Sequence, residues 1–184
     1  MSKYVFSADY HLGHSNIIKH CNRPFSSVEE MDEAIVNNHN KVVGPDDVFI
    51  HAGDFCLFKS YDRVMKNYIN RLNGHKVFLM GSHDKWLSKC DNIRDIWKGE
   101  VNKRYVVVCH YLMRIWPLSH YGSWHLYGHS HGKATHLEEG KQLDIGIDSH
   151  NFYPLTFNQI SDIMNSKNEN PNLISNRFKG EHSM

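Results

Sequence analysis

The sequence of 184 residues lacks several features that mark common classes of protein. Its four cysteines, Cys21, Cys56, Cys90 and Cys109, include no Cys-x-x-Cys pair, which argues against a disulfide framework and a zinc ribbon. No apolar run approaches the ~20 residues that a membrane span needs, and Met1–Lys3 is too short for a signal peptide. We therefore expect a soluble, cytoplasmic protein with reduced thiols and no membrane partner.

The chain also lacks a charge excess of either sign, with 21 Lys and Arg against 20 Asp and Glu. This balance creates no global field that would attract nucleic acid or an anionic membrane. No basic run with interleaved aromatic residues marks an extended nucleic-acid surface. Any anionic ligand must therefore be bound locally, and the sequence does not indicate the oligomeric state.

The chain contains no internal repeat and no stretch that would serve as a linker between domains. Its length suits one compact domain with a sizeable core. We predict a single domain over residues 1–164, followed by a polar C-terminal tail over residues 165–184. The tail is rich in Asn, Ser and Lys, and we expect it to be partly mobile.

Histidine, by contrast, is abundant, with 15 copies. Histidines and aspartates recur together in five short clusters, most of which directly follow a β-like apolar run. The clusters are Asp9-Tyr10-His11, Gly53-Asp54, Gly81-Ser82-His83-Asp84, Cys109-His110 and Gly128-His129-Ser130-His131. Loops at strand ends are where a rigid sheet can aim side chains at one point, and these side chains are of types that hold a divalent metal.

Hydrophobic patterning predicts how the chain is organised around these clusters. Buried strands are expected at residues 4–8, 48–51, 76–80, 105–109 and 124–127. Helices are expected to begin after Ser27, where Glu30 completes a capping box, and after Ser60, from which the second helix runs to Leu72. Alternating strands and helices in the first half imply parallel pairing, and the shorter connections that follow suggest antiparallel or mixed pairing. We predict an α/β fold in which helices enclose a sandwich of sheets.

The spacing within the clusters suits metal binding. In an extended segment, residues two apart point to the same side, so Asp9 and His11 can direct two ligands at one region. His129 and His131 have the same spacing. A single Asp-x-His is weak evidence, and a single Gly-His-Ser-His could be a turn with hydrogen-bonded imidazoles. All five clusters in this order are far more specific, and the pattern is typical of a two-metal phosphoesterase.

With these motifs the chain resembles the calcineurin-like metallophosphoesterase superfamily, whose pattern is Asp-x-His, Gly-Asp, Gly-Asn-His-Asp, a His, then Gly-His-x-His. The similarity spans residues 5–131. The chain looks most similar to the small, cap-less bacterial and phage phosphoesterases, because residues 11–18, 22–25 and 144–148 resemble stretches found there. The resemblance implies an αββα sandwich of two mixed β-sheets flanked by helices.

The resemblance also assigns metal-binding roles. It implies a first metal held by Asp9, His11 and His131, a second held by His110 and His129, and a bridge between them at Asp54. A carboxylate can bridge two cations, and neutral imidazoles complete each shell without excess negative charge. The ions are expected to be Mn²⁺, with Ni²⁺, Fe²⁺ or Zn²⁺ as alternatives. They would share a bridging hydroxide as nucleophile and stabilise an in-line transition state in the hydrolysis of a phosphate ester.

The third cluster implies the general acid and contains one departure from the family pattern. His83 would protonate the leaving oxygen, with Asp84 holding its imidazole in position. Ser82 stands where the family has an asparagine that ligates the second metal, and serine is a weaker ligand. Two hypotheses follow: a metal-dependent phosphodiesterase, and a phosphoesterase-fold binding or scaffold protein with an impaired second metal site. Retention of every other ligand favours the enzyme.

Three further residues are candidates for binding the substrate. His14 and Arg23 follow the first cluster, where a cation can contact a phosphate; the alternatives are a packing role for His14 and a surface salt bridge for Arg23. Tyr111 follows His110 and could support a nucleobase. Because no evident insertion forms a lid, we predict small phosphodiesters or nucleotide-type compounds as substrates in preference to monoesters.

Overall fold

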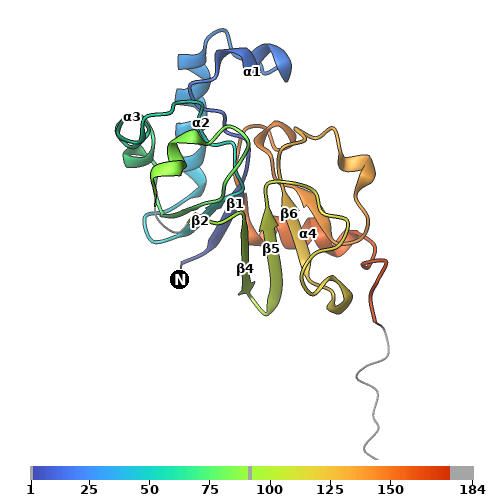
Figure 1. Ribbon diagram of the computed structural model, residues 1–184. Helices are drawn as coiled ribbons and strands as arrows, with labels where there is room; N and C mark the ends of the chain where they lie inside the picture. Colours follow the sequence, from blue (N-terminus) through green and yellow to red (C-terminus); the bar gives the residue numbers. More distant parts are fainter. Residues whose placement is uncertain (1, 91–92, 175–184) are drawn as a thin grey trace, which may run out of the picture.

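Two four-stranded β-sheets face each other in the computed structural model, which describes residues 2–90 and 93–174 (Figure 1). The first sheet has the strand order β3-β2-β1-β8. Its strands are β1 (Tyr4–Ser7), β2 (Val48–His51), β3 (His75–Phe78) and β8 (Leu155–Thr156). Strands β1, β2 and β3 run parallel, and β8 is antiparallel to β1. The sheet is therefore mixed, and its three parallel strands end at the same edge.

The second sheet has the order β4-β5-β6-β7. Its strands are β4 (Ile96–Val101), β5 (Arg104–Cys109), β6 (Trp124–Tyr127) and β7 (Gln142–Asp144). Strands β4 and β5 form an antiparallel hairpin, whereas β5, β6 and β7 run parallel. The hairpin turns at Asn102 and Lys103, both of which have positive φ, the conformation that a tight two-residue hairpin requires. This sheet is also mixed, as the sequence suggested for the second half of the chain.

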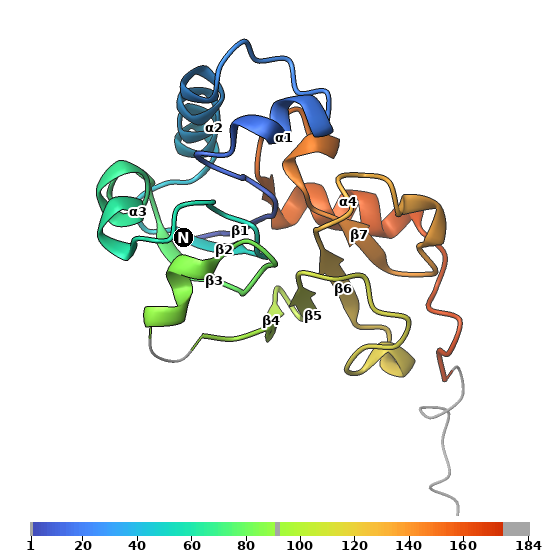
Figure 2. The ribbon, with the colours of Figure 1, turned by 45° about the horizontal axis from the view of Figure 1, so that its top comes forward.

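Helices flank the sheets (Figure 2). The α-helices are α1 (Ser15–His20), α2 (Val28–Val42), α3 (Tyr61–Asn67) and α4 (Phe157–Ser166). Single 3₁₀ turns occur at Ile69–Arg71, Lys85–Lys89, Ser119–Tyr121, Thr135–Leu137 and Ile147–Ser149. The predicted α/β class, with two mixed sheets flanked by helices, is confirmed.

The two-residue period of a strand divides the core into two layers. From β1, Phe6 is fully buried between the sheets, in a cluster with Val106 and Leu126 of the second sheet. Its neighbour Val5 points to the opposite face and packs in a cluster with Ile35 of α2. The first sheet is thus buried on both faces, which accounts for its nearly continuous apolar strands.

Several local features differ from the sequence prediction. The Ser27 hydroxyl caps α2 by accepting from the Glu30 amide, but the Glu30 carboxylate accepts from Ser26 instead of completing the capping box at Ser27. The second predicted helix stops at Asn67 instead of reaching Leu72, because Tyr68 leaves helical geometry and its hydroxyl bonds the buried Asp32. Elements β4, β7, β8, α1 and α4 had not been predicted.

The last part of the described chain is packed onto the domain. Asn170 is 3% exposed; its side-chain oxygen accepts from the Lys141 amide, and its side-chain nitrogen donates to the carbonyls of Ser119 and Ser123. Residues 175–184 of the predicted mobile tail lie outside the described residues. No helix in the described part of the chain combines the length and apolar character needed to cross a bilayer.

Candidate metal centre

The five His and Asp clusters meet where parallel strands of the two sheets end. Asp9 and His11 follow β1, and Asp54 follows β2, all from the first sheet. His110 follows β5, and the pair His129 and His131 follows β6, from the second sheet. Parallel strands place their carboxyl ends at one edge, so residues far apart in the sequence converge there.

The converging side chains form two sets of three. In each set, the ligand atoms lie within 4.8 Å of one another; the sets are Asp9, His11 and His131, and Asp54, His110 and His129. Asp54 lies between them, with its Oδ2 atom 3.6 Å from Nε2 of His11 and 3.4 Å from Nε2 of His110. Each set draws ligands from both sheets, and one carboxylate adjoins both sets.

Three atoms of these sets are buried without a hydrogen-bond partner. They are Oδ1 of Asp9, Nε2 of His11 and Nε2 of His110. Leaving a buried polar atom unsatisfied costs about 1–3 kcal/mol each. The unsatisfied atoms belong to oxygen and imidazole donors that suit divalent transition metals, so these residues fit a pair of cations.

The backbone is strained at most of these positions. Five residues have left-handed φ angles: 60° at Asp9, 51° at His11, 57° at Asp54, 68° at His129 and 49° at His131. Such conformations are unfavourable for residues other than glycine, and they concentrate at functional sites. Gly81 allows close packing beside them, because a Cβ atom there would lie 2.1 Å from the amide nitrogen of Asp54. The loops are therefore shaped to present these side chains.

The two carboxylates of the ligand sets have pKa values that shift in opposite directions. Burial alone would raise the pKa of Asp54, but the adjacent imidazole of His110, whose Nε2 atom lies 3.4 Å from Oδ2, holds that pKa well below its usual value. For Asp9, burial dominates over the opposing charges of His131 and His110 and raises the pKa to about 7. Asp54 therefore remains an anion, and a cation near Asp9 would restore the charge that burial disfavours.

The Asp148 carboxylate, which also pairs with Arg23, supports His131. The Nδ1 atom of His131 lies 2.7 Å from Oδ2 of Asp148, which leaves its Nε2 atom to face the first ligand set. Burial alone would raise the pKa of Asp148, but its bonds to His131 and Arg23 lower it to about 2. A carboxylate that accepts from the outer nitrogen of a metal-ligating histidine fixes its tautomer and ring orientation.

The prediction that Arg23 contacts a substrate phosphate is wrong. Its guanidinium is fully buried and forms a bidentate pair with Asp148 at 2.8 Å, and it also donates to the carbonyl oxygens of Asp9 and Tyr10. These bonds occupy the N–H donors of the guanidinium, which are therefore not available to a phosphate. The alternative prediction, a surface salt bridge for Arg23, is wrong as well, because the pair with Asp148 is buried.

The prediction that Asp84 holds the imidazole of His83 also needs correction. The Asp84 carboxylate accepts from the backbone amides of residues 54, 55, 56 and 81 and from the indole of Trp86. With its two oxygens engaged in this way, Asp84 fixes the loop that carries Asp54. Adjacent side chains in this turn point in different directions, so the adjacency of His83 and Asp84 in the sequence did not mean that their side chains are in contact.

Asp54 is held in place by the third cluster. Its carboxylate accepts from the His83 amide at 2.8 Å and from the Ser82 hydroxyl at 3.0 Å. The side chain of His83 is 43% exposed, with Nε2 4.0 Å from Oδ2 of Asp54. Ser82 therefore adjoins the centre, and its hydroxyl is bonded to the Asp54 carboxylate.

The two remaining candidates for substrate binding, His14 and Tyr111, lie at the rim of the centre. The Nδ1 atom of His14 lies 3.3 Å from Nδ1 of His11, and its ring centroid lies 5.7 Å from that of His83. Tyr111 is 49% exposed, and its ring packs edge-on to the rings of His110 and His129, 4.8 Å from each. His14 and Tyr111 thus stand beside the ligand sets.

Two aspartates that support the centre had been assigned no role from the sequence. Besides Asp148, Asp144 accepts from the Ser130 hydroxyl and from the amides of Gly132 and Gly146, so it braces the loop that carries His129 and His131. Both aspartates lie in the stretch 144–148, whose family resemblance was the available signal.

Comparisons with known proteins give two similarities, and no protein-family model matches the chain. The chain is 34% identical over 167 residues to the uncharacterized protein MJ1445 of Methanocaldococcus jannaschii, across 87% of this chain and 90% of that protein. The structure is similar to that of AQ665, a protein of unknown function from Aquifex aeolicus, with a TM-score of 0.68 and 21% sequence identity, over 89% of this chain and 100% of that chain. The second similarity concerns the fold alone.

Proposed function

We propose that this chain, which belongs to the same family as the archaeal protein MJ1445, hydrolyses phosphate esters at a centre of two divalent metal ions. One observation carries the proposal: two sets of three ligands meet at Asp54, which belongs to one set and lies 3.6 Å from His11 of the other, and three buried atoms of these sets have no hydrogen-bond partner. We also propose that its fold is the αββα sandwich of the calcineurin-like metallophosphoesterases, because the ligand order along the chain matches their motifs.

The residues divide into holders of metal and residues that act on the substrate. Asp9, His11 and His131 would hold the first ion, and His110 and His129 would hold the second, with Asp54 between them. Divalent ions bound here would activate water as a nucleophile and stabilise charge on the phosphoryl oxygens. Mn²⁺ suits this mixture of carboxylates and imidazoles, and Ni²⁺, Fe²⁺ and Zn²⁺ are alternatives.

His83 is suited to donate a proton to the leaving oxygen. Its partial exposure lets it reach a bound ester, and its position beside Asp54 keeps it near the reacting phosphate. His14 can orient His11, because one of the two facing Nδ1 atoms must donate to the other. If Nδ1 of His11 is the donor, Nε2 of His14 carries a proton that it can offer to a phosphate oxygen.

A phosphodiester is the better substrate class for this centre. Tyr111 and His83 are both substantially exposed at the rim, so the described residues leave room for groups on two sides of the phosphate. A monoester carries one more negative charge, and the buried Arg23 offers it no contact. The preference for small or nucleotide-type diesters follows from this exposure.

The test is hydrolysis of bis-p-nitrophenyl phosphate beside p-nitrophenyl phosphate, after metal removal and titration with Mn²⁺, Ni²⁺, Zn²⁺ or Mg²⁺. We expect metal-dependent turnover that favours the diester and falls at least about 100-fold in Asp54→Ala and His83→Ala. His75→Ala is the matched control, because His75 is exposed at the opposite end of the first sheet. Unchanged turnover in the first two variants would reject the assignment. No turnover with any ion in the parent protein would instead favour a scaffold role with an impaired centre.

A further inference from the structure

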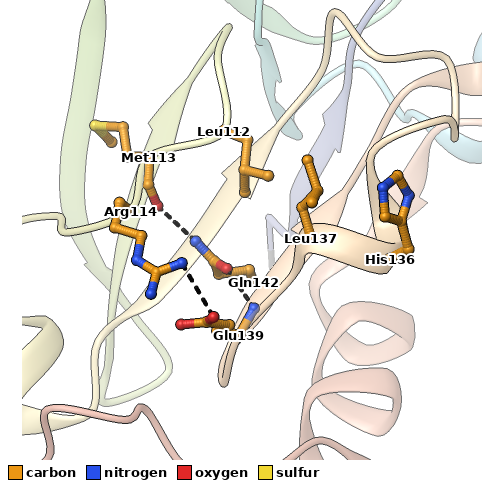
Figure 3. Close-up of a pocket in the computed structure, with 7 residues that line it drawn as sticks. All are labelled: Leu112, Met113, Arg114, His136, Leu137, Glu139 and Gln142. Atoms are coloured by element: carbon orange, nitrogen blue, oxygen red, sulfur yellow. Dashed lines mark hydrogen bonds and ion pairs between the residues drawn. The ribbon is translucent and has the colours of Figure 1, made fainter.

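A cavity of about 320 Å³ lies in the second sheet's half of the molecule, between segments 112–114 and 136–142. Figure 3 shows Leu112 and Leu137 at its apolar side, with Arg114, Glu139 and Gln142 on the other. None of these residues takes part in the candidate metal centre. The volume is at the lower end of the range found for pockets that bind small molecules.

The first wall of the cavity continues the chain from the metal centre. Leu112 comes two residues after His110, so their Cα atoms can be at most ~7 Å apart. Tyr111 stands between them, with its ring packed against His110 and His129. The second wall begins five residues after His131 with His136, in a short 3₁₀ turn. Tyr111 thus links the centre to the first wall, and a group attached to a phosphate at the centre could extend over Tyr111 toward the cavity.

The first wall is fixed in place by buried polar side chains. His125, which is fully buried in β6, receives the Met113 amide on Nε2 at 3.1 Å. Gln142 is 2% exposed; its Nε2 atom donates to the Met113 carbonyl at 2.6 Å, and its Oε1 atom accepts from the Glu139 amide at 2.7 Å. The segment after Tyr111 is thus tied to the sheet before any ligand binds, which lowers the entropic cost of binding.

The lining favours an uncharged, partly apolar ligand. Arg114 and Glu139 are the charged residues of the lining; they form an ion pair at 3.0 Å, with side chains 81% and 47% exposed, and together add no net charge. Leu137 is 58% exposed, so a ligand would cover apolar surface that now faces water. A second phosphate would find no unpaired cation among these residues. A flat ring with hydrogen-bonding edges would find apolar walls, a tyrosine at the entrance and polar groups beyond.

We propose that this cavity binds the nucleobase of a nucleoside esterified to the phosphate that the metal centre attacks. The inference rests on the proposed function and narrows its substrate class to nucleoside-bearing phosphodiesters. Tyr111 would contact the base or sugar, and Leu112 and Leu137 would cover the faces of the base.

The test compares two esters that share one leaving group: thymidine 5′-(p-nitrophenyl phosphate) and methyl p-nitrophenyl phosphate. We expect the wild-type kcat/KM to favour the thymidine ester, and Leu137→Asp to lower that preference about tenfold. Leu112→Ala should lower it less. Ile115→Asp is the control, because Ile115 is 73% exposed on the same loop and does not line this cavity. An equal preference in wild type and Leu137→Asp would overturn the proposal.

A second measurement needs no catalysis. In saturation-transfer NMR with metal-free protein and thymidine, transfer should occur in wild type and Ile115→Asp and be lost in Leu137→Asp. If no ester is hydrolysed but this Leu137-dependent transfer persists, the phosphoesterase function fails and the base site stands. Saturation transfer that is absent from wild type, or that persists in Leu137→Asp, would overturn the proposed base site. A concentration-dependent change in sedimentation that Leu137→Asp abolishes would overturn it too, by identifying a second copy of this chain as the occupant.

Discussion

Replacement of Arg23 by glutamine tests whether the buried ion pair beneath the first ligand set stabilises both the fold and the site. The Arg23 side chain is fully buried and Asp148 is 9% exposed, so little solvent screens the pair. Removing one partner of a buried pair costs about 3–5 kcal/mol. Asp148 keeps its bond to His131, so we expect the lower end, about 3 kcal/mol of the free energy of unfolding.

The assay is urea denaturation of the metal-free protein, with Arg71→Gln as the matched control. Arg71 also makes two hydrogen bonds to one carboxylate, from Nη1 and Nη2 to Glu33, but the two side chains are 39% and 55% exposed, so its loss should cost at most about 1 kcal/mol. Calorimetric titration with Mn²⁺ should also show affinity about 10-fold or more weaker in Arg23→Gln. In a protein that already carries Asp148→Asn, Arg23→Gln should cause little additional loss of unfolding free energy. Similar losses in Arg23→Gln and Arg71→Gln, or full additivity with Asp148→Asn, would refute the reasoning.

Two other predictions concern the second metal and acid stability. Ser82→Asn should tighten binding of the second ion, because an amide oxygen is a better ligand than a hydroxyl that is bonded to Asp54; identical two-site affinities in calorimetric titrations of both proteins would contradict this. Burial lowers the pKa of His39 and of His125 to about 4 each. Their folded-state pKa values lie below the unfolded value of about 6.5, so the stability they support is present above pH 6.5 and is lost as the pH falls toward 4. Each should remove up to about 3 kcal/mol over that range. Urea denaturation at pH 7 and pH 5 measures the loss, His75→Gln should leave it unchanged, and an unfolding free energy that stays constant between these pH values would count against it.

The central strands and the ligand types could be predicted from the sequence because both are local properties. Apolar runs predicted β2 and β6 at their observed bounds. Strand β4 was missed because Lys98 and Glu100 interrupt its apolar pattern at the sheet edge, and its residues are mostly exposed or half-buried. Helix α4 did carry a signal, since Thr156 and Gln159 form a capping box.

Contacts between distant residues account for most of what the sequence did not predict at the site. Arg23 and Asp148 are 125 positions apart, and their pairing depends on how the two sheets are placed. The sequence showed that Arg23 follows the first cluster but not that it points inward. The predicted role of Asp84 was wrong for a related reason. Its carboxylate accepts from the amides of residues 54–56, and only the fold brings that loop to it.

Ions bound at this centre would also govern how long the molecule survives. Each ligand set takes side chains from both sheets, so any motion that opens the seam between the sheets must first break coordination bonds. A ligand that binds only the folded state stabilises it by RT ln(1 + [L]/Kd). Opening of the seam, and with it exposure of the chain to proteases, should therefore become rarer as free metal rises. Metal supply in the cell would then set the lifetime of the protein as well as its activity.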